Sequence, residues 1–285
     1  MSVSLPRFFR SHLLSFSGAV LLFPLAALLV AFAAPVSTEA QQTAAPITTS
    51  ATAGAPTPSD VVREFYRAWR EKRFRDAFMM SIHRPAIESL SAEEYEDLRP
   101  DFERNAALMP FKVEISGEQI SGDTATVFVR YVEHAGDSPS DTAPVMLLGA
   151  GGTWIIGDRA EQEEVKKAGR EFFFNARIEQ HQQDVEAVLV RIANAQALYS
   201  VQHGGLCTDL RTLVAATPSL KDIETSDSTG YHFRINVSKN AKVCTAGAEP
   251  ARYGRTGRLS FFMDQTGITK KDNEGKPLKG STARK

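Results

Sequence analysis

Residues 178–199 read IEQHQQDVEAVLVRIANAQALY, and this stretch decides how the second half of the chain folds. Its apolar side chains recur every three or four residues, which is typical of an amphipathic helix of about six turns. The members of the stripe are Ile178, His181, Val185, Val188, Leu189, Ile192, Ala195 and Tyr199. The helix is expected to end at Gly204 and Gly205, because glycine is favoured where a helix stops. So long an apolar stripe has to be buried against other segments, and we therefore expect a folded domain around this helix.

The segments expected to cover this helix lie further along the chain. Thr208 and Asp209 are suited to cap a short helix that runs through Val214. Three later segments alternate apolar and polar residues as strands do: 231–235, 243–248 and 259–263. A turn at 264–267 closes the series. We therefore predict an α+β domain over residues 176–272, with one long helix packed on an antiparallel sheet.

Cys207 and Cys244 are the only two cysteines, and both fall within this domain. An even cysteine count within one small exported domain favours a disulfide, with two separate buried thiols as the alternative. A bridge over a loop of this length would stabilise the fold by roughly 3–4 kcal/mol on the chain-entropy model. The two residues lack the C-x-x-C spacing of redox pairs, and too few Cys and His surround them for zinc.

An earlier α+β domain is predicted over residues 57–160. Thr57 and Asp60 mark a helix start, and the apolar residues after them keep helical spacing through Trp69. A second helix is expected from about Phe74, and a capping box at 91–94 opens a short third one. After Pro110 the pattern alternates, which predicts strands at 111–115, 125–131, 145–148 and 154–156.

Three stretches in this region carry a family resemblance: VVREFYRAWREKRFRDAF at 61–78, GDTATVFV at 122–129 and GGTWII at 151–156. Together with the order of helices before strands, they resemble the cone-shaped nuclear-transport-factor-like superfamily. The resemblance implies a sheet curved around helices. Some families on this fold are enzymes, which need a carboxylate or histidine base inside the cone and a donor for the oxyanion.

The face expected to line the cone carries neither an acid nor a histidine: Val113, Ile115, Ala125, Val127, Val129, Tyr131 and Trp154. Tyr66, Tyr131 and Trp154 are the candidate contacts for a ligand in the cone, although a half-buried core tyrosine is the commoner arrangement. We expect His83 and His134 to be exposed loop residues. His181 is expected to be a core or edge residue satisfied by hydrogen bonding. No catalytic, cofactor-binding or metal-binding residue is predicted.

The second domain resembles the globular heads of type II secretion major pseudopilins, and of type IV pilins more broadly. The matching stretches, in order, are 195–199 (AQALY), 209–213 (DLRTL), 230–233 (GYHF), 248–250 (AEP) and 256–267 (TGRLSFFMDQTG). The resemblance implies a long helix packed on a sheet. In pilins a hydrophobic helix with an early Glu continues directly into the head, whereas here the hydrophobic segment lies a whole domain away. Asp264 alone is too few oxygen ligands for the calcium that such heads often bind.

The N-terminal 34 residues contain an apolar run from Leu13 to Ala34 that follows Arg7 and Arg10, with no acid before Glu39. This pattern predicts a signal peptide or signal anchor, with cleavage and retention both open. Residues 35–56 read as a disordered linker rich in Ala, Thr and Pro. Residues 161–175 are predicted to be a connecting helix whose three phenylalanines pack between the domains. Residues 273–285 read as a flexible basic tail.

These patterns predict an exported two-domain α+β protein: a cone domain, a long connecting helix and a pilin-like head. Formal net charge is −1, which gives no reason to expect nucleic acid as a partner. We expect a non-catalytic periplasmic or extracytoplasmic protein, secreted or tethered to the inner membrane by an uncleaved N-terminal segment. Its expected partners are other envelope proteins, including secretion or pilus components. The alternative is a small apolar-ligand binder or an enzyme that uses the cone.

Overall fold

The structure is a computed structural model that describes residues 55–226 and 229–279. The predicted signal segment 1–34, nearly all of the linker 35–56 and the last residues of the tail lie outside these ranges. Within them, none of the helices combines the length and the apolar character needed to cross a membrane. The described chain forms two α+β units, each with its own four-stranded antiparallel sheet.

The first unit begins with four helices, of which the first packs on the sheet. Their bounds are α2 Pro58–Arg70, α3 Phe74–Met79, α4 Arg84–Glu88 and α5 Ala92–Ala106. Both predicted capping boxes are present, with Thr57 and Asp60 at α2 and Ser91 and Glu94 at α5. The predicted short third helix is 15 residues long, because it continues through Pro100.

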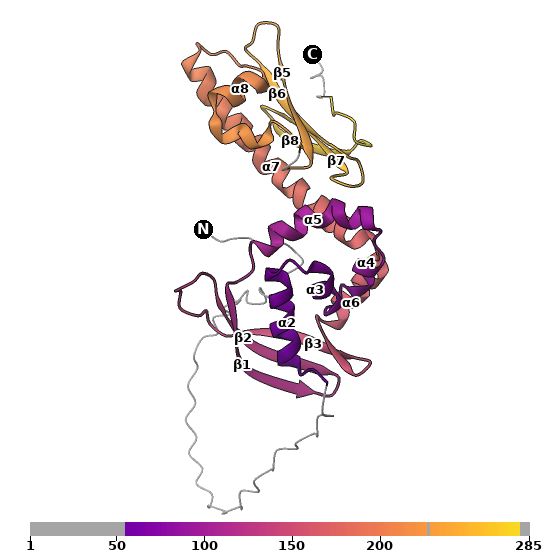
Figure 1. Ribbon diagram of the computed structural model, residues 1–285. Coiled ribbons are helices and arrows are strands. Elements are labelled where there is room, and N and C mark those ends of the chain that lie inside the picture. The colour runs from indigo at the N-terminus through magenta and orange to yellow at the C-terminus, as the bar shows by residue number, and fades with distance from the viewer. Residues whose placement is uncertain (1–54, 227–228, 280–285) are drawn as a thin grey trace, which may run out of the picture.

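Sheet A follows in the strand order β1-β2-β3-β4 and lies below α2 in Figure 1. Its strands are β1 Lys112–Ser121, β2 Thr124–Val132, β3 Ala143–Ala150 and β4 Thr153–Ile156. The expected inner face is formed by cross-strand pairs such as Val113 with Tyr131 and Ile115 with Val129. A register shift between Ile115 and Gly117 then changes which residues of β1 point inward.

This register shift places a carboxylate on the face that the sequence pattern predicted to carry none. Glu118 lies opposite the fully buried Val127, on the side of the sheet that α2 covers. Its Oε2 accepts hydrogen bonds from the Ser59 backbone N–H at 2.8 Å and from the Ser59 hydroxyl at 2.5 Å. Glu118 therefore anchors the first turn of α2, where a carboxylate is favoured because helix N–H groups are unpaired there.

The predicted connecting helix is in fact two helices. The first is α6, Arg159–Ala168, and the second is α7, Glu171–Gln202. Gly169 separates them with a backbone φ of +52°, a conformation that side-chain-bearing residues rarely adopt. The phenylalanine cluster therefore belongs to the start of the long helix.

Helix α7 contributes to both hydrophobic cores. At its N-terminal end Phe173 and Phe174 are each 1% exposed and pack in the core of the first unit. At its other end Val185, Leu189 and Ile192 are buried in the core of the second unit. Figure 1 shows α7 running from beside α6 up into the second unit. One continuous helix thus joins the two units.

The second unit packs α7 against the smaller helices α8 Leu210–Ala216 and η1 Pro218–Ile223 and against sheet B. Sheet B has the order β5-β6-β7-β8, with β5 Tyr231–Val237, β6 Cys244–Pro250, β7 Leu259–Asp264 and β8 Gly267–Asp272. The predicted turn at 264–267 is thus a hairpin that leads into β8, a strand the sequence pattern did not indicate. Its residues Thr269, Lys270 and Lys271 are exposed on this edge strand, so no apolar alternation marks it.

Candidate functional site

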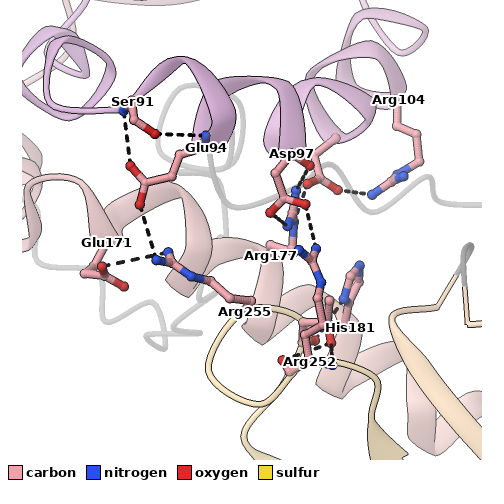
Figure 2. Close-up of polar contacts among 11 residues, drawn as sticks. Ser91, Glu94, Asp97, Arg104, Glu171, Arg177, His181, Arg252 and Arg255 are labelled. Carbon is pink, nitrogen blue, oxygen red and sulfur yellow. Dashed lines mark hydrogen bonds and ion pairs between the residues drawn. The ribbon is translucent and has the colours of Figure 1, made fainter.

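The most strongly connected group of polar side chains lies where the two units meet, and we call it the arginine junction. It comprises acids of α5, residues of α7 and the loop 251–258 of the second unit, as Figure 2 shows. Arg177 of α7 is central, with its side chain only 5% exposed. Its Nη1 donates to Asp97 at 2.9 Å and its Nε donates to Asp101 at 2.5 Å, and it also bonds the Asp97 carbonyl oxygen.

Two arginines of the loop 251–258 reach the same helix α5. Arg252 pairs with Asp97 at 2.6 Å, and Arg255 pairs with Glu94 at 3.2 Å. Burial raises the pKa of the Asp97 carboxyl, but hydrogen bonds from Arg252 and Arg177 outweigh this and hold the pKa below its ordinary value. Asp97 therefore bonds arginines from both α7 and the second unit.

Glu94 has two functions in the arginine junction. Its carboxylate accepts a hydrogen bond from the Ser91 backbone N–H, which lowers the pKa of Glu94 and completes the capping box of α5. The same carboxylate pairs with Arg170 at 3.0 Å as well as with Arg255. Arg255 also lies over the ring of Phe174, with 4.0 Å between its Cζ and the ring centroid.

His181 lies one turn beyond Arg177 on α7, as the sequence pattern predicted, and it is buried. Its Nδ1 lies 2.9 Å from the Thr256 carbonyl oxygen, so the ring donates this bond. Burial lowers the pKa of His181; the Thr256 carbonyl and Asp101 oppose this shift, and Arg177 and Arg104 reinforce it. Gly230 packs directly against the ring and leaves no room for a Cβ. The prediction that hydrogen bonding satisfies His181 is confirmed.

The three candidate ligand contacts of the cone do not share one cavity. The hydroxyls of Tyr66 and Tyr131 lie 3.0 Å apart and are hydrogen-bonded to each other, and both rings are buried. Burial raises the pKa of Tyr66 well above its ordinary value, and the Tyr131 hydroxyl adds to this, so the phenol stays neutral. Tyr66 and the half-buried Trp154 line a groove along α2, whose lining does not include Tyr131.

The interior of the first unit is occupied by its own aromatic side chains. Trp69, Phe74, Phe78 and Phe102 are each at most 3% exposed, and Phe173 of α7 packs against Phe78 and Phe102 at centroid distances of 4.8 and 5.4 Å. The long helix therefore contributes to filling the interior of the first unit.

The expectation that His83 is exposed was wrong. Its side chain is 7% exposed and packs beside the rings of Phe78 and Phe172, with the Ser81 hydroxyl 3.2 Å from Nδ1. Pro85 begins the short helix α4 instead of a loop, and this folds His83 inward against α6 and α7. His134, by contrast, is exposed as predicted, with an 85% exposed side chain.

Cys207 and Cys244 form a disulfide, as the cysteine count predicted, with their Cα atoms 6.1 Å apart. The bridge joins the loop after α7 to the start of β6. It borders a groove of about 480 Å³ between α7 and sheet B, lined mainly by apolar residues such as Ile192, Ala197 and Met263. We call this the head groove.

The described polar groups are arranged to hold structure together. The arginine junction consists of charges that neutralise one another, and arginine guanidinium groups do not lose protons in proteins. Among the residues of 55–226 and 229–279, no group of three or more His, Cys, Asp or Glu side chains is placed to hold a metal ion. The sequence pattern did not predict the junction, because Asp97 and Arg177 lie 80 residues apart.

Comparisons with known proteins add two partial similarities. No protein-family model and no curated protein matches the chain. A segment resembles a Campylobacter jejuni protein described as an NTF2-like transpeptidase, with 15% identity over 36% of this chain and 100% of that chain, and a TM-score of 0.27. A SEC-C motif containing protein from Rhodopseudomonas palustris is 22% identical over 36% of this chain and 76% of that chain, with a TM-score of 0.24. Neither similarity concerns a pilin, and at such scores neither supports an inference about function.

Replacing Arg177 tests the arginine junction. We expect Arg177→Met to lower the free energy of unfolding by about 3 kcal/mol, the lower end of the range for breaking a buried ion pair, because Asp97 and Asp101 keep other arginine partners. Arg177→Lys should recover only part of this, since an ammonium cannot match the forked geometry of a guanidinium. Urea unfolding at pH 7, followed by circular dichroism, measures both effects.

Arg252→Met is the matched control, because Arg252 also pairs with Asp97 but its side chain is 54% exposed. An exposed pair contributes about 0–1 kcal/mol, so this variant should lose little stability. If Arg177→Met and Arg252→Met lowered the free energy of unfolding equally, the burial of Arg177 would not contribute to stability as we expect.

The buried His181 predicts a loss of stability as the pH falls. The unfolded chain binds this proton near pH 6.5, whereas the folded protein binds it only at lower pH. The unfolded state thus holds more protons between those two pKa values, and stability declines as the pH drops through that window. His181→Gln, whose amide can still donate to Thr256, should flatten the decline between about pH 7 and 5. An unchanged pH slope in this variant would contradict the assignment.

Proposed function

We propose that this protein is a non-catalytic envelope protein that acts as a binding or structural module, associated with secretion or pilus machinery. The observation that carries the proposal is that α7 fills the interior of the first unit and forms the spine of the second. Phe173 and Phe174 occupy the interior of the first unit, so on this proposal the interior attaches α7 rigidly instead of holding a ligand. The first unit then serves as a base from which the second unit is presented.

The arginine junction supports this role because it resists bending between the two units. Arg252 and Arg255 of the second unit bind acids of α5, and Gln182 of α7 accepts hydrogen bonds at 3.1 Å from the backbone N–H groups of Arg258 and Leu259. The buried pairs of Arg177 are less affected by salt than the pairs of Arg252 and Arg255, whose side chains are 54% and 33% exposed. A protein that presents a binding surface benefits from such a rigid support, because less motion has to be lost on binding.

The free end of α7 supplies a surface for protein partners. Leu198 and Val201 on the helix are 60% and 83% exposed, and Leu206 and Val243 beside it are 41% and 53% exposed. Leu198 and Val201 lie about one turn apart on α7, and Val243 lines the head groove beside the disulfide. Exposed apolar residues that gather in one place mark protein contact sites more often than scattered ones do.

Capture from native envelopes tests this function. The full-length tagged protein is purified in mild detergent, and the co-purifying proteins are identified by mass spectrometry. We expect pseudopilins or secretion-platform proteins to be captured, and at least a tenfold loss of them with the variant Leu198→Ser/Val201→Ser. The expected cause is the loss of apolar area at the free end of α7.

The matched control is Phe111→Ser/Ile120→Ser, which removes two similarly exposed apolar side chains (57% and 53%) from the first unit. It should leave capture unchanged. An eluate without secretion or pilus components, or one that the α7 variant does not alter, would contradict the proposal and favour the alternative of a ligand-binding first unit.

A further inference from the structure

A groove of about 970 Å³ runs along α2, and we call it the α2 groove. Strands β1 and β4 and the segment after α3 wall it in. This groove is separate from the head groove, and its apolar residues pack against the core of the first unit. Its volume lies at the upper end of the range for small-molecule sites, about 300–1,000 Å³.

The floor of the α2 groove is apolar and only half-buried. It is formed by Met79, Met80, Val113, Trp154 and Ile155, all of intermediate exposure. Methionines adapt their shape to different apolar partners, and a tryptophan offers a large flat surface. Such a floor suits an aliphatic chain or a ring.

The rim of the groove is mostly cationic. Arg63, Arg67 and Arg70 follow one another along α2, and Arg84 and Lys112 face them from α4 and β1. Only two carboxylates, Asp60 and Glu64, line the same groove. Five cations against two acids give the lining itself an excess of positive charge, although Glu88 and Glu114 just outside it pair with Arg84 and Lys112.

The cations of the rim are available to an anion. Arg63, Arg67, Arg84 and Lys112 each pair with a neighbouring acid, but their side chains are 55–61% exposed. Exposed pairs contribute little energy, so an incoming anion can replace the acid. The Arg70 side chain forms no ion pair or hydrogen bond with any residue in the part of the chain that the structure describes.

We propose that the α2 groove binds an anionic amphiphile, a small molecule with an apolar chain or ring and a phosphate or carboxylate group. The apolar part lies on the floor beside Trp154, and the anionic group lies at the rim between Arg67 and Arg70. Arginine suits this role because its planar fork binds phosphate and carboxylate through two parallel hydrogen bonds. This site is independent of the protein contacts proposed for the second unit.

Trp154 makes the site directly measurable, because the only other tryptophan, Trp69, is 1% exposed. The full chain is titrated with dodecyl phosphate below its micelle concentration, and tryptophan emission is recorded. Dodecyltrimethylammonium, with the same chain and the opposite charge, and inorganic phosphate are titrated in parallel. We expect a saturable blue shift with dodecyl phosphate at concentrations at least tenfold below any response to the other two.

Three variants locate the binding. Arg67→Gln/Arg70→Gln should weaken dodecyl phosphate binding at least tenfold, and Trp154→Phe should abolish the spectral change. Lys242→Gln, which removes the cation that lines the head groove, should change nothing. Circular dichroism with and without ligand confirms that each variant and complex stays folded. Equal responses to the two dodecyl compounds, or full binding by the arginine variant, would overturn the proposal.

Vesicles then distinguish the two sources of such a ligand. If phosphatidylglycerol vesicles displace dodecyl phosphate and sediment with the protein, the groove takes lipid headgroups at a membrane surface. If dodecyl phosphate binds and the vesicles do not displace it, the groove takes free amphiphiles. Both results support an anionic amphiphile site, and absence of binding to dodecyl phosphate contradicts it.

Discussion

The guanidinium of Arg177 is held almost entirely out of water between Asp97 and Asp101, and the arrangement of the two units depends on it. A buried charge of this kind is tolerated only when its partners are close and its N–H groups are used. Because Arg177 lies on α7 and its acids lie on α5, satisfying this charge fixes the long helix against the first unit. The same helix is the spine of the second unit, so the constraint reaches sheet B.

Much of the local structure could be predicted because it depends on neighbouring residues. The stripe on α7, the capping boxes at Thr57 and Ser91 and the hydrogen-bonded His181 all follow from short-range patterns, and the structure confirms them. The disulfide between Cys207 and Cys244 was predicted from the cysteine count and from the expected export of the chain. Each of these features needed no knowledge of how distant segments meet.

The features that were missed depend on long-range geometry. The register shift in β1 turned the exposed Glu118 toward the first turn of α2, and an alternating pattern cannot reveal a shift of phase. His83 is the N-cap residue of the short helix α4 and is buried, although its neighbour Pro85 looks like a turn residue. The arginine junction joins residues 80 positions apart, so its acids looked like ordinary surface charges of α5.

Two different surfaces follow from this architecture. Aromatic side chains occupy the core of the first unit, and the α2 groove beside that core offers apolar and cationic groups. The second unit instead exposes apolar residues at the end of α7, which suits a protein partner. The rigid helix separates these two surfaces and keeps their spacing constant.

The central claim is that the two units form one rigid body, and a distance distribution between them tests it most directly. Spin labels are placed at the exposed residues Glu88 and Lys271, one in each unit, and their separation is measured by double electron–electron resonance. We predict one narrow distance distribution. It should be the same at about 0.1 M and about 1 M salt, because salt screens buried ion pairs only weakly. A broad or multi-peaked distribution in the unmodified junction would contradict the account.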